Sequence, residues 1–352
     1  MKKKIDVCFV APIKSKYVGG IYVWYKNIIS KLGNDSYITI DSSNSFPTHN
    51  FLGRILRNVF SFKKLFTQKR ELIKYIKKYV IGTLHIASSG GNGYLRDYVL
   101  LKTAKKHNIK TVLHLHYGKV SEEFETSKMI GKYCRKALNL SDKILVLDKK
   151  SMLFLQNKKI ACKLLNNPVD IMQNVYNQNS KQIIFVGHVI PEKGICELLR
   201  AFENVIKIFP EITLKIIGPF KQKFLDSIKL KYGLKNVYFC GELKHSITLE
   251  EISKSKMLIL PSYTEGMPNV VLESMSLSVP VIATDVGNIP SMIEGAGVLI
   301  HPKSDLEIYN AIMYLLNNEE ICLLYSKAGK DKIVNEYNLD EILFELSNIW
   351  KE

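Results

Sequence analysis

The 352-residue sequence predicts an α/β protein built from two doubly wound parallel sheets, each covered by helices. Short runs of β-branched and aromatic residues alternate with longer segments of helical periodicity, which is typical of parallel sheets. The length exceeds the roughly 250–300 residues at which a single hydrophobic core stops growing. The alternation also starts afresh in the second half of the chain, so two Rossmann-like domains are expected.

The strand-like runs form two sets. The first set comprises 5–11, 38–40, 83–87, 111–116 and 143–147. The second set comprises 182–186, 213–217, 237–239, 257–260, 280–283 and 298–300. Helical periodicity then covers 306–316, 319–336 and 340–350, so the chain should end in a run of helices.

The linker between the domains is predicted at Asn166-Asn167-Pro168-Val169-Asp170, which combines turn chemistry with proline stiffness. Residues 1–167 should therefore form the N-terminal domain, and residues 168–335 the C-terminal domain. Residues 336–352 should form a C-terminal helix that can pack back toward the N-terminal domain.

Charge distinguishes the two halves. Residues 1–170 carry 32 basic and 11 acidic side chains, a balance of +21, whereas residues 171–352 carry 18 and 22, a balance of −4. No apolar run reaches the roughly 18 residues that a membrane-spanning helix needs, and no signal peptide is expected. Six scattered cysteines without metal-ligand spacing indicate reduced thiols and favour the cytosol.

The segment 51–79 combines an apolar stripe with a cationic border. This pattern suits a helix on an anionic membrane surface. It equally suits an amphipathic core helix with a solvated basic face, and both interpretations stay open. Nucleic acid is not expected as a partner, because no recognised binding motif accompanies the charge.

Two glutamates mark the candidate site. Glu265 follows the strand-like run 257–260, and Glu273 lies in a predicted helix that Pro268 opens. Open α/β sheets bind ligands at the carboxyl ends of their strands, and the N–H groups of 267–271 at the helix start suit phosphates. Because carboxylates accept hydrogen bonds from diols, the arrangement fits a nucleoside diphosphate with hydroxyl-rich groups at both ends.

The surrounding Pro-Ser-x-x-Glu-Gly-Met-Pro-Asn-x-x-Leu-Glu resembles the retaining glycosyltransferases of family 4. The resemblance implies the GT-B fold, with two Rossmann-like domains facing across a cleft: a basic acceptor-side domain and a nucleotide-sugar-binding domain. It implies that Glu265 lies by the donor sugar and that Glu273 holds the ribose hydroxyls. The donor-binding set then also includes Gly266, Met267, Asn269 and Val270.

A second segment, Ile184-Phe-Val-Gly187-His188-Val-Ile-Pro-Glu-Lys193-Gly194, is similar to the family segment that supplies cations to the donor diphosphate. Lys193 matches that pattern. His188 stands where the family usually has arginine, and an imidazole with an ordinary pKa of about 6.5 brings no permanent charge at neutral pH. His188 is either a donor-binding residue or a strand-end histidine without a role.

In the first half, Gly19-Gly20 opens a helix and allows a close backbone approach to an anion. The resemblance implies that Gly20 faces the diphosphate and that His116 contacts the donor sugar, with His114 structural. Gly90-Gly91-Asn92-Gly93 lacks the last glycine of a dinucleotide fingerprint, so it is interpreted as a loop lining the acceptor site.

The resemblance implies a retaining hexosyltransferase, with His116, Glu265 and Lys193 as catalytic residues and no cofactor. No Asp-x-Asp occurs, so no metal is expected. The expected donor is a UDP-sugar rather than a GDP-sugar, carrying a hexose or N-acetylhexosamine. The expected acceptor is a lipid-linked saccharide of bacterial O-antigen or capsule biosynthesis, at the cytoplasmic face of the membrane. An epimerase or phosphorylase of the same fold, or a non-catalytic nucleotide-sugar or membrane-binding protein, are the alternatives.

Overall fold

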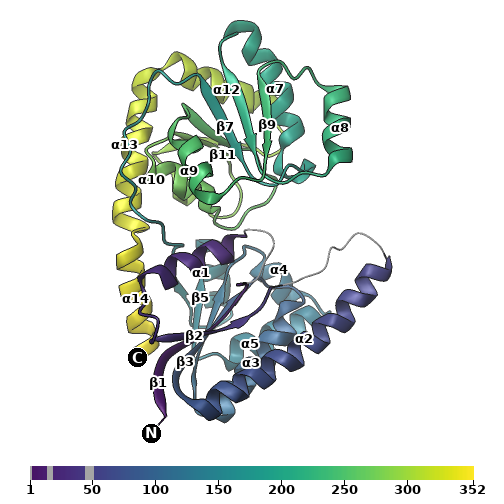
Figure 1. The fold of residues 1–352 in the computed structure, drawn as a ribbon, viewed down its shortest axis with the longest axis vertical. Coiled ribbons are helices and arrows are strands. Elements are labelled where there is room, and N and C mark those ends of the chain that lie inside the picture. The colour runs from purple at the N-terminus through teal and green to yellow at the C-terminus, as the bar shows by residue number, and fades with distance from the viewer. Residues whose placement is uncertain (1, 14–18, 44–50) are drawn as a thin grey trace. The chain divides into compact units, whose positions relative to one another are not determined.

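The computed structural model describes residues 2–13, 19–43 and 51–352, with side chains throughout except at 51–62. The chain divides into two compact units (Figure 1). One unit comprises Met1–Pro168 together with Leu339–Glu352, and the other comprises Val169–Asn338. Within segment 51–79, the side chains of residues 51–62 lie outside the described part of the structure.

The first unit contains a parallel six-stranded sheet in the order β2-β1-β3-β4-β5-β6. Its strands are β1 Lys3–Ala11, β2 Tyr37–Asp41, β3 Tyr79–Ser88, β4 Lys110–Leu115, β5 Lys143–Val146 and β6 Lys163–Leu164. Its helices are α1 Gly20–Lys31, α2 Phe51–Lys78, α3 Gly93–Lys106, α4 Val120–Glu125, α5 Met129–Leu140, α6 Lys149–Asn157 and α14 Leu339–Lys351.

The second unit contains a parallel six-stranded sheet in the order β12-β11-β10-β7-β8-β9. Its strands are β7 Gln182–Val186, β8 Thr213–Ile217, β9 Val237–Gly241, β10 Met257–Leu260, β11 Val281–Thr284 and β12 Gly297–Ile300. Its helices are η1 Pro191–Lys193, α7 Ile195–Ile208, α8 Gln222–Lys231, α9 His245–Ser253, α10 Asn269–Ser276, α11 Ile289–Ile293, α12 Asp305–Asn317 and α13 Glu319–Glu336.

The predicted fold class is confirmed, since both sheets are parallel and every predicted strand is present. One strand, β6, was not predicted, because two residues are too short to show a period. The order of the second sheet reverses between β7 and β10. Loops that leave these two neighbouring strands turn in opposite directions, which opens a crevice at the carboxyl edge of a doubly wound sheet.

The C-terminal helix α14 belongs to the first unit. It runs beside α1 in Figure 1, and its Trp350 joins Phe9 and Trp24 in one buried cluster. The indole N–H of Trp350 donates to Nδ1 of His85 at 3.0 Å. The C-terminal part of the first unit begins at Leu339, three residues after the predicted start of the C-terminal helix at 336.

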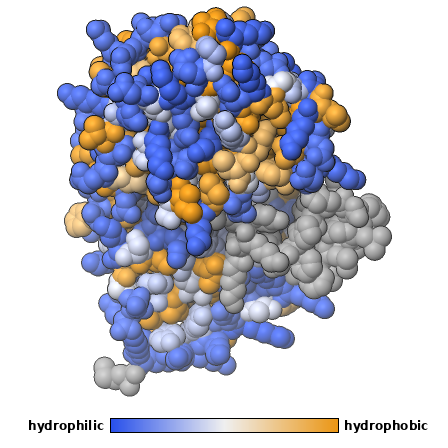
Figure 2. All heavy atoms as spheres, turned by 45° about the horizontal axis from the view of Figure 1, so that its top comes forward, coloured by the Kyte–Doolittle hydropathy of each residue, from blue (hydrophilic) through white to orange (hydrophobic). Residues whose placement is uncertain are grey.

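The visible face in Figure 2 is mostly hydrophilic, with apolar side chains scattered over it. Within the described part of the chain, no helix combines the length and the apolar character that crossing a bilayer demands. All six cysteines are free. Cys8, Cys134 and Cys322 are buried, whereas the other three are half-buried.

Candidate active site

The loop between β10 and α10 positions the two glutamates. All four residues of β10 are buried, so the strand is fixed within the sheet. Pro268, with φ of −73°, is the N-cap of α10 rather than a residue of its first turn. Glu265 lies in the loop with 14% of its side chain exposed, and Glu273 lies on α10 with 8% exposed.

Lys193 is the cationic partner of Glu265. Its Nζ lies 2.5 Å from Oε1 of Glu265, and 24% of the lysine side chain is exposed. The loop after β7 carries Lys193 and the loop after β10 carries Glu265, so the pair lies at the point where the strand order reverses. Because the two charges compensate each other, the pair avoids the free-energy cost of burying a single unpaired charge.

Gly194 makes this approach possible. Its φ of +71° is left-handed, and a Cβ at this position would lie 2.1 Å from the carbonyl oxygen of Pro261. Next to it, the N–H of Tyr263 donates to the carbonyl of Glu192 at 2.9 Å. A glycine is therefore required for the two loops to interlock, because any side chain would push them apart.

A third loop supports Glu265 from the side of β11. Gly287 has φ of +60°, and a Cβ there would lie 2.3 Å from the carbonyl oxygen of Glu265. The N–H of Asn288 donates to the carbonyl of Gly266 at 2.8 Å. Sequence reasoning missed this loop, although Asp-Val-Gly-Asn between a strand and a Pro-containing helix start is a recognisable turn signal.

Glu273 has a partner that the sequence analysis also missed. Nε2 of His245 lies 2.8 Å from Oε1 of Glu273. His245 is the first residue of α9, and 48% of its side chain is exposed. The hydrogen bond to Glu273 raises the pKa of His245, against the opposing effect of burial.

His188 lies two residues beyond the end of β7, where the charge of Lys193 acts on it. Burial first, and the charge of Lys193 second, lower the pKa of His188 below its usual value. The imidazole is therefore neutral at neutral pH, and it can exchange one hydrogen bond but supplies no charge.

The start of α10 offers fewer N–H groups than expected. The N–H of Val271 donates to the carbonyl of Pro268 at 3.1 Å, so it is already used. Asn269 and Val270 form the beginning of the helix, and Met267 is buried in the loop before it. The anion-binding end of α10 is thus confined to the residues before Val271.

In the first unit, α1 begins at Gly20, with Gly19 as its N-cap. His116 lies one residue beyond β4, and its ring centroid is 4.0 Å from that of His114 and 4.8 Å from that of Trp24. Nε2 of His116 is buried and has no hydrogen-bond partner among the described residues. Burial lowers the pKa of His116 to about 3, so the ring is neutral.

The glycine-rich loop after β3 already holds an anionic group of the chain itself. Gly90 and Gly91 have φ of +70° and +58°, and the N–H of Gly91 donates to both carboxylate oxygens of Glu123 at 3.0 Å. The backbone N–H that a pyrophosphate would use is therefore occupied by Glu123.

The structure thus brings Lys193, Glu265 and Gly266 together on interlocked loops, with His188 beside Lys193. Gly20 and His116 belong to the first unit. In the described ranges, no group of three or more His, Cys, Asp or Glu side chains is arranged to hold a metal ion.

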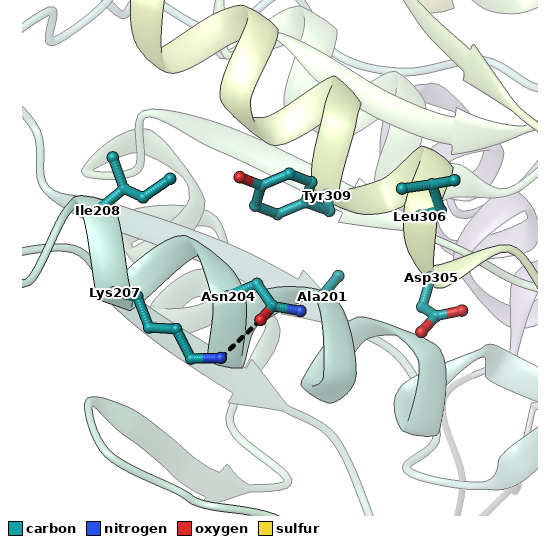
Figure 3. Close-up of a pocket in the computed structure, with 7 residues that line it drawn as sticks. All are labelled: Ala201, Asn204, Lys207, Ile208, Asp305, Leu306 and Tyr309. Carbon is teal, nitrogen blue, oxygen red and sulfur yellow. Dashed lines mark hydrogen bonds between the residues drawn. The ribbon is translucent and has the colours of Figure 1, made fainter.

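Two hollows of the second unit lie apart from the glutamates. One of about 400 Å³ lies between α7 and α12 (Figure 3). It is lined by Ala201, Asn204, Lys207, Ile208, Asp305, Leu306 and Tyr309. Its one drawn polar contact, from Lys207 to Asn204 at 2.8 Å, joins neighbours on one helix, so this hollow lacks the convergent polar groups of the loop site.

Comparison with known proteins identifies similar chains. The model of the family described as glycosyl transferases group 1 matches residues 167–332. An uncharacterized glycosyltransferase of Methanocaldococcus jannaschii is 27% identical over 351 residues, which cover 96% of this chain and 95% of the relative. The O-antigen biosynthesis glycosyltransferase WbnH of Escherichia coli is 26% identical over 304 residues, covering 82% and 84%.

Among solved structures, HepE of Anabaena in complex with UDP is similar over the full length of both chains. The TM-score is 0.75, and the sequence identity is 16%. At that identity the likeness shows a shared fold of two parallel α/β units.

Proposed function

We propose that this chain transfers a hexose or an N-acetylhexosamine from a nucleotide sugar to a saccharide acceptor. The chain belongs to the group 1 glycosyltransferases, which retain anomeric configuration and share the GT-B fold. The observation that carries the proposal is the Lys193–Glu265 pair at the point where the second sheet reverses its strand order. This is where doubly wound sheets bind nucleotides.

In the proposed site, each group has a distinct task toward the donor. The Lys193 ammonium has three N–H donors, so it can hold Glu265 and still donate to the diphosphate. The N-terminal end of α10 adds partial positive charge, with Gly266, Met267, Asn269 and Val270 around it. Glu273 accepts hydrogen bonds from the ribose hydroxyls, and Glu265 accepts them from the sugar.

The largest catalytic contribution is stabilisation of the departing diphosphate by these preorganised donors. The acceptor hydroxyl attacks the sugar on the face from which the diphosphate leaves, so the anomeric configuration is retained. A phosphate oxygen takes the proton of that hydroxyl. His116 orients the sugar, and Gly20 allows the backbone to approach the diphosphate. His188 contributes a hydrogen bond without charge, in keeping with its lowered pKa.

UDP is the proposed nucleotide. The similar HepE structure holds UDP, which supports this choice over GDP. The acceptor is proposed to be a lipid-linked saccharide in the assembly of a bacterial surface polysaccharide. The likeness to WbnH, a glycosyltransferase of O-antigen biosynthesis, supports that class of acceptor.

The proposed location is the cytoplasmic face of the cell membrane. In the described part of α2, Leu65 and Leu72 are buried, which favours an amphipathic core helix with a solvated basic face. Lys74 and Lys77 are exposed on that face. Contact with an anionic membrane would then be electrostatic, and each basic residue near the surface adds about 1 kcal/mol.

A donor screen tests the function. The purified protein is mixed with UDP- and GDP-linked hexoses and N-acetylhexosamines, and binding is followed by the shift in thermal stability that a ligand of the folded state causes. A UDP-sugar should stabilise the protein and be consumed with a saccharide acceptor. Interconversion of the donor without any acceptor would instead indicate an epimerase, and binding without turnover would indicate a non-catalytic protein.

A further inference from the structure

The contact between His245 and Glu273 joins α9 to α10. Nε2 of His245 and Oε1 of Glu273 are 2.8 Å apart, across 28 residues of sequence. Among the described residues, this is the one side-chain hydrogen bond found for Glu273. Because only 8% of the Glu273 side chain is exposed, the hydrogen bond from His245 restricts how the carboxylate is oriented.

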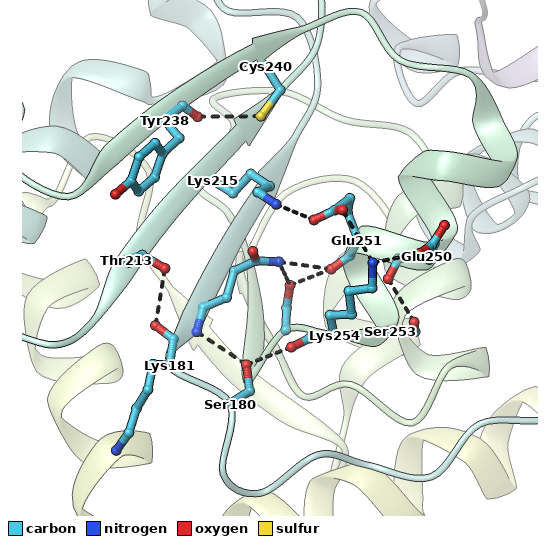
Figure 4. Close-up of polar contacts among 12 residues, drawn as sticks. Ser180, Lys181, Thr213, Lys215, Tyr238, Cys240, Glu250, Glu251, Ser253 and Lys254 are labelled. Carbon is cyan, nitrogen blue, oxygen red and sulfur yellow. Dashed lines mark hydrogen bonds and ion pairs between the residues drawn. The ribbon is translucent and has the colours of Figure 1, made fainter.

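Helix α9 holds His245 in place through contacts at its other end (Figure 4). Glu251 forms an ion pair with Lys215 of β8, and its carbonyl accepts a hydrogen bond from the side chain of Gln182 of β7 at 3.0 Å. The same amide donates to Ser255 at 2.8 Å. The helix is therefore anchored on two neighbouring strands, and His245 is presented from a fixed element rather than from a free loop end.

The carboxylate of Glu273 can accept further hydrogen bonds besides the one from His245. A carboxylate offers about four lone-pair directions, and the imidazole uses one of those on Oε1. Oε2 receives no hydrogen bond from the described residues. A vicinal diol needs two acceptor directions, and a carboxylate whose rotation is already fixed loses less conformational entropy when it binds both hydroxyls.

We propose that His245 is a positioning residue that fixes Glu273 to accept both hydroxyls of the donor ribose, and so makes the site selective for ribonucleotides over 2′-deoxyribonucleotides. The inference rests on the proposed function, in which Glu273 binds the ribose. His245 does not touch the reacting atoms. It restricts the rotation of a group that does bind the ligand, which is the usual effect of a supporting hydrogen bond on a binding side chain.

The test compares UDP and GDP with their 2′-deoxy analogues by calorimetry, using the full chain. In His245→Ala, the affinity for the ribonucleotide should fall about three- to tenfold, which is the effect of one hydrogen bond, and the affinity for the 2′-deoxy analogue should fall less. The ratio of the affinity for the ribonucleotide to that for the 2′-deoxy analogue should therefore decrease. His245→Gln, whose amide N–H can donate to Glu273, should restore part of it. In turnover, the donor KM should rise while kcat stays within about twofold.

His301→Ala is the matched control. His301 is exposed and also bonds a carboxylate, with Nδ1 3.0 Å from Oε2 of Glu307, but this pair does not involve Glu273. Its removal should leave the ribose preference unchanged.

The results distinguish a failure of the role of His245 from a failure of the proposed ribose site at Glu273. If Glu273→Ala abolishes the ribose preference and His245→Ala preserves it in full, the role of His245 is overturned while the proposed site stands. If the wild-type protein binds neither nucleotide, or binds both sugar forms equally, the proposed role of Glu273 is overturned and the inference with it.

Discussion

The ammonium of Lys193 lies 2.5 Å from a carboxylate oxygen of Glu265, although 72 residues separate the two in sequence. The reversal of strand order between β7 and β10 produces this contact, because it makes the loops after these strands neighbours. Gly194 then lets the two loops meet without a clash. The geometry of the pair is therefore a property of the sheet.

Replacing Gly194 should disturb both stability and activity. Gly194→Ala places a Cβ within 2.1 Å of Pro261 at a left-handed φ of +71°, so we expect a loss of about 1–3 kcal/mol in the free energy of unfolding. Gly295→Ala is a close control, because Gly295 has the same φ but no heavy atom within 4 Å of its Cβ position. Urea denaturation and turnover are measured for both. Equal losses in the two variants would show that the close approach to Pro261 does not matter.

Removing the second glutamate should weaken donor binding. Glu273→Ala takes away a buried carboxylate that is proposed to hold the ribose, so the donor KM should rise at least tenfold, in line with the loss of charge-assisted hydrogen bonds. Initial rates at varied donor concentration measure this effect. An unchanged KM would contradict the assignment of Glu273.

Acid should destabilise the first unit through its buried histidines. Burial lowers the pKa of His85 and of His116 to about 3, and it lowers that of His114 well below its usual value. Between pH 3 and the unfolded value of about 6.5, the unfolded chain binds more protons than the folded one. Stability should therefore be fully present above about pH 6.5 and fall on acidification, by up to about 1.4 kcal/mol per pH unit for each histidine.

Denaturant midpoints between pH 4 and 7 measure this dependence. His114→Phe should reduce its slope, whereas His107→Phe, the same substitution at an exposed histidine, serves as the control. A stability that rises on acidification in this range would contradict the interpretation.

Membrane association should depend on the basic face of α2 and on salt. Co-sedimentation with vesicles containing phosphatidylglycerol should be strong at low ionic strength and decrease above about 0.1 M salt, where the Debye length is about 10 Å. The pair Lys74→Glu and Lys77→Glu should lose binding more than Lys223→Glu with Lys229→Glu, which makes the same charge change in the second unit. No binding to vesicles at low salt would rule out this location.

The local patterns of the sequence predicted most of the fold, because strand and helix periods depend on neighbouring residues. Met257–Leu260 and Glu319–Glu336 coincide with their predicted bounds, for example. The candidate residues Glu265, Glu273 and Lys193 were named from a motif. Their partners were not all foreseen, because contacts such as that of His245 with Glu273 depend on which strands become neighbours in the sheet. The two-residue strand β6 carries too little local signal to be singled out. The loop at Gly287 has a turn signal, but its approach to Glu265 depends on which strands become neighbours.

The turnover of Lys193→Ala tests the central claim most directly. The full chain, its UDP-sugar and its acceptor are used, with Lys207→Ala on the exposed face of α7 as the control in the same unit. Removing a preorganised donor to the leaving diphosphate should lower kcat by about 10²- to 10³-fold, while the control keeps wild-type turnover. Full turnover in Lys193→Ala, with the protein folded, would contradict a donor site built on the Lys193–Glu265 pair.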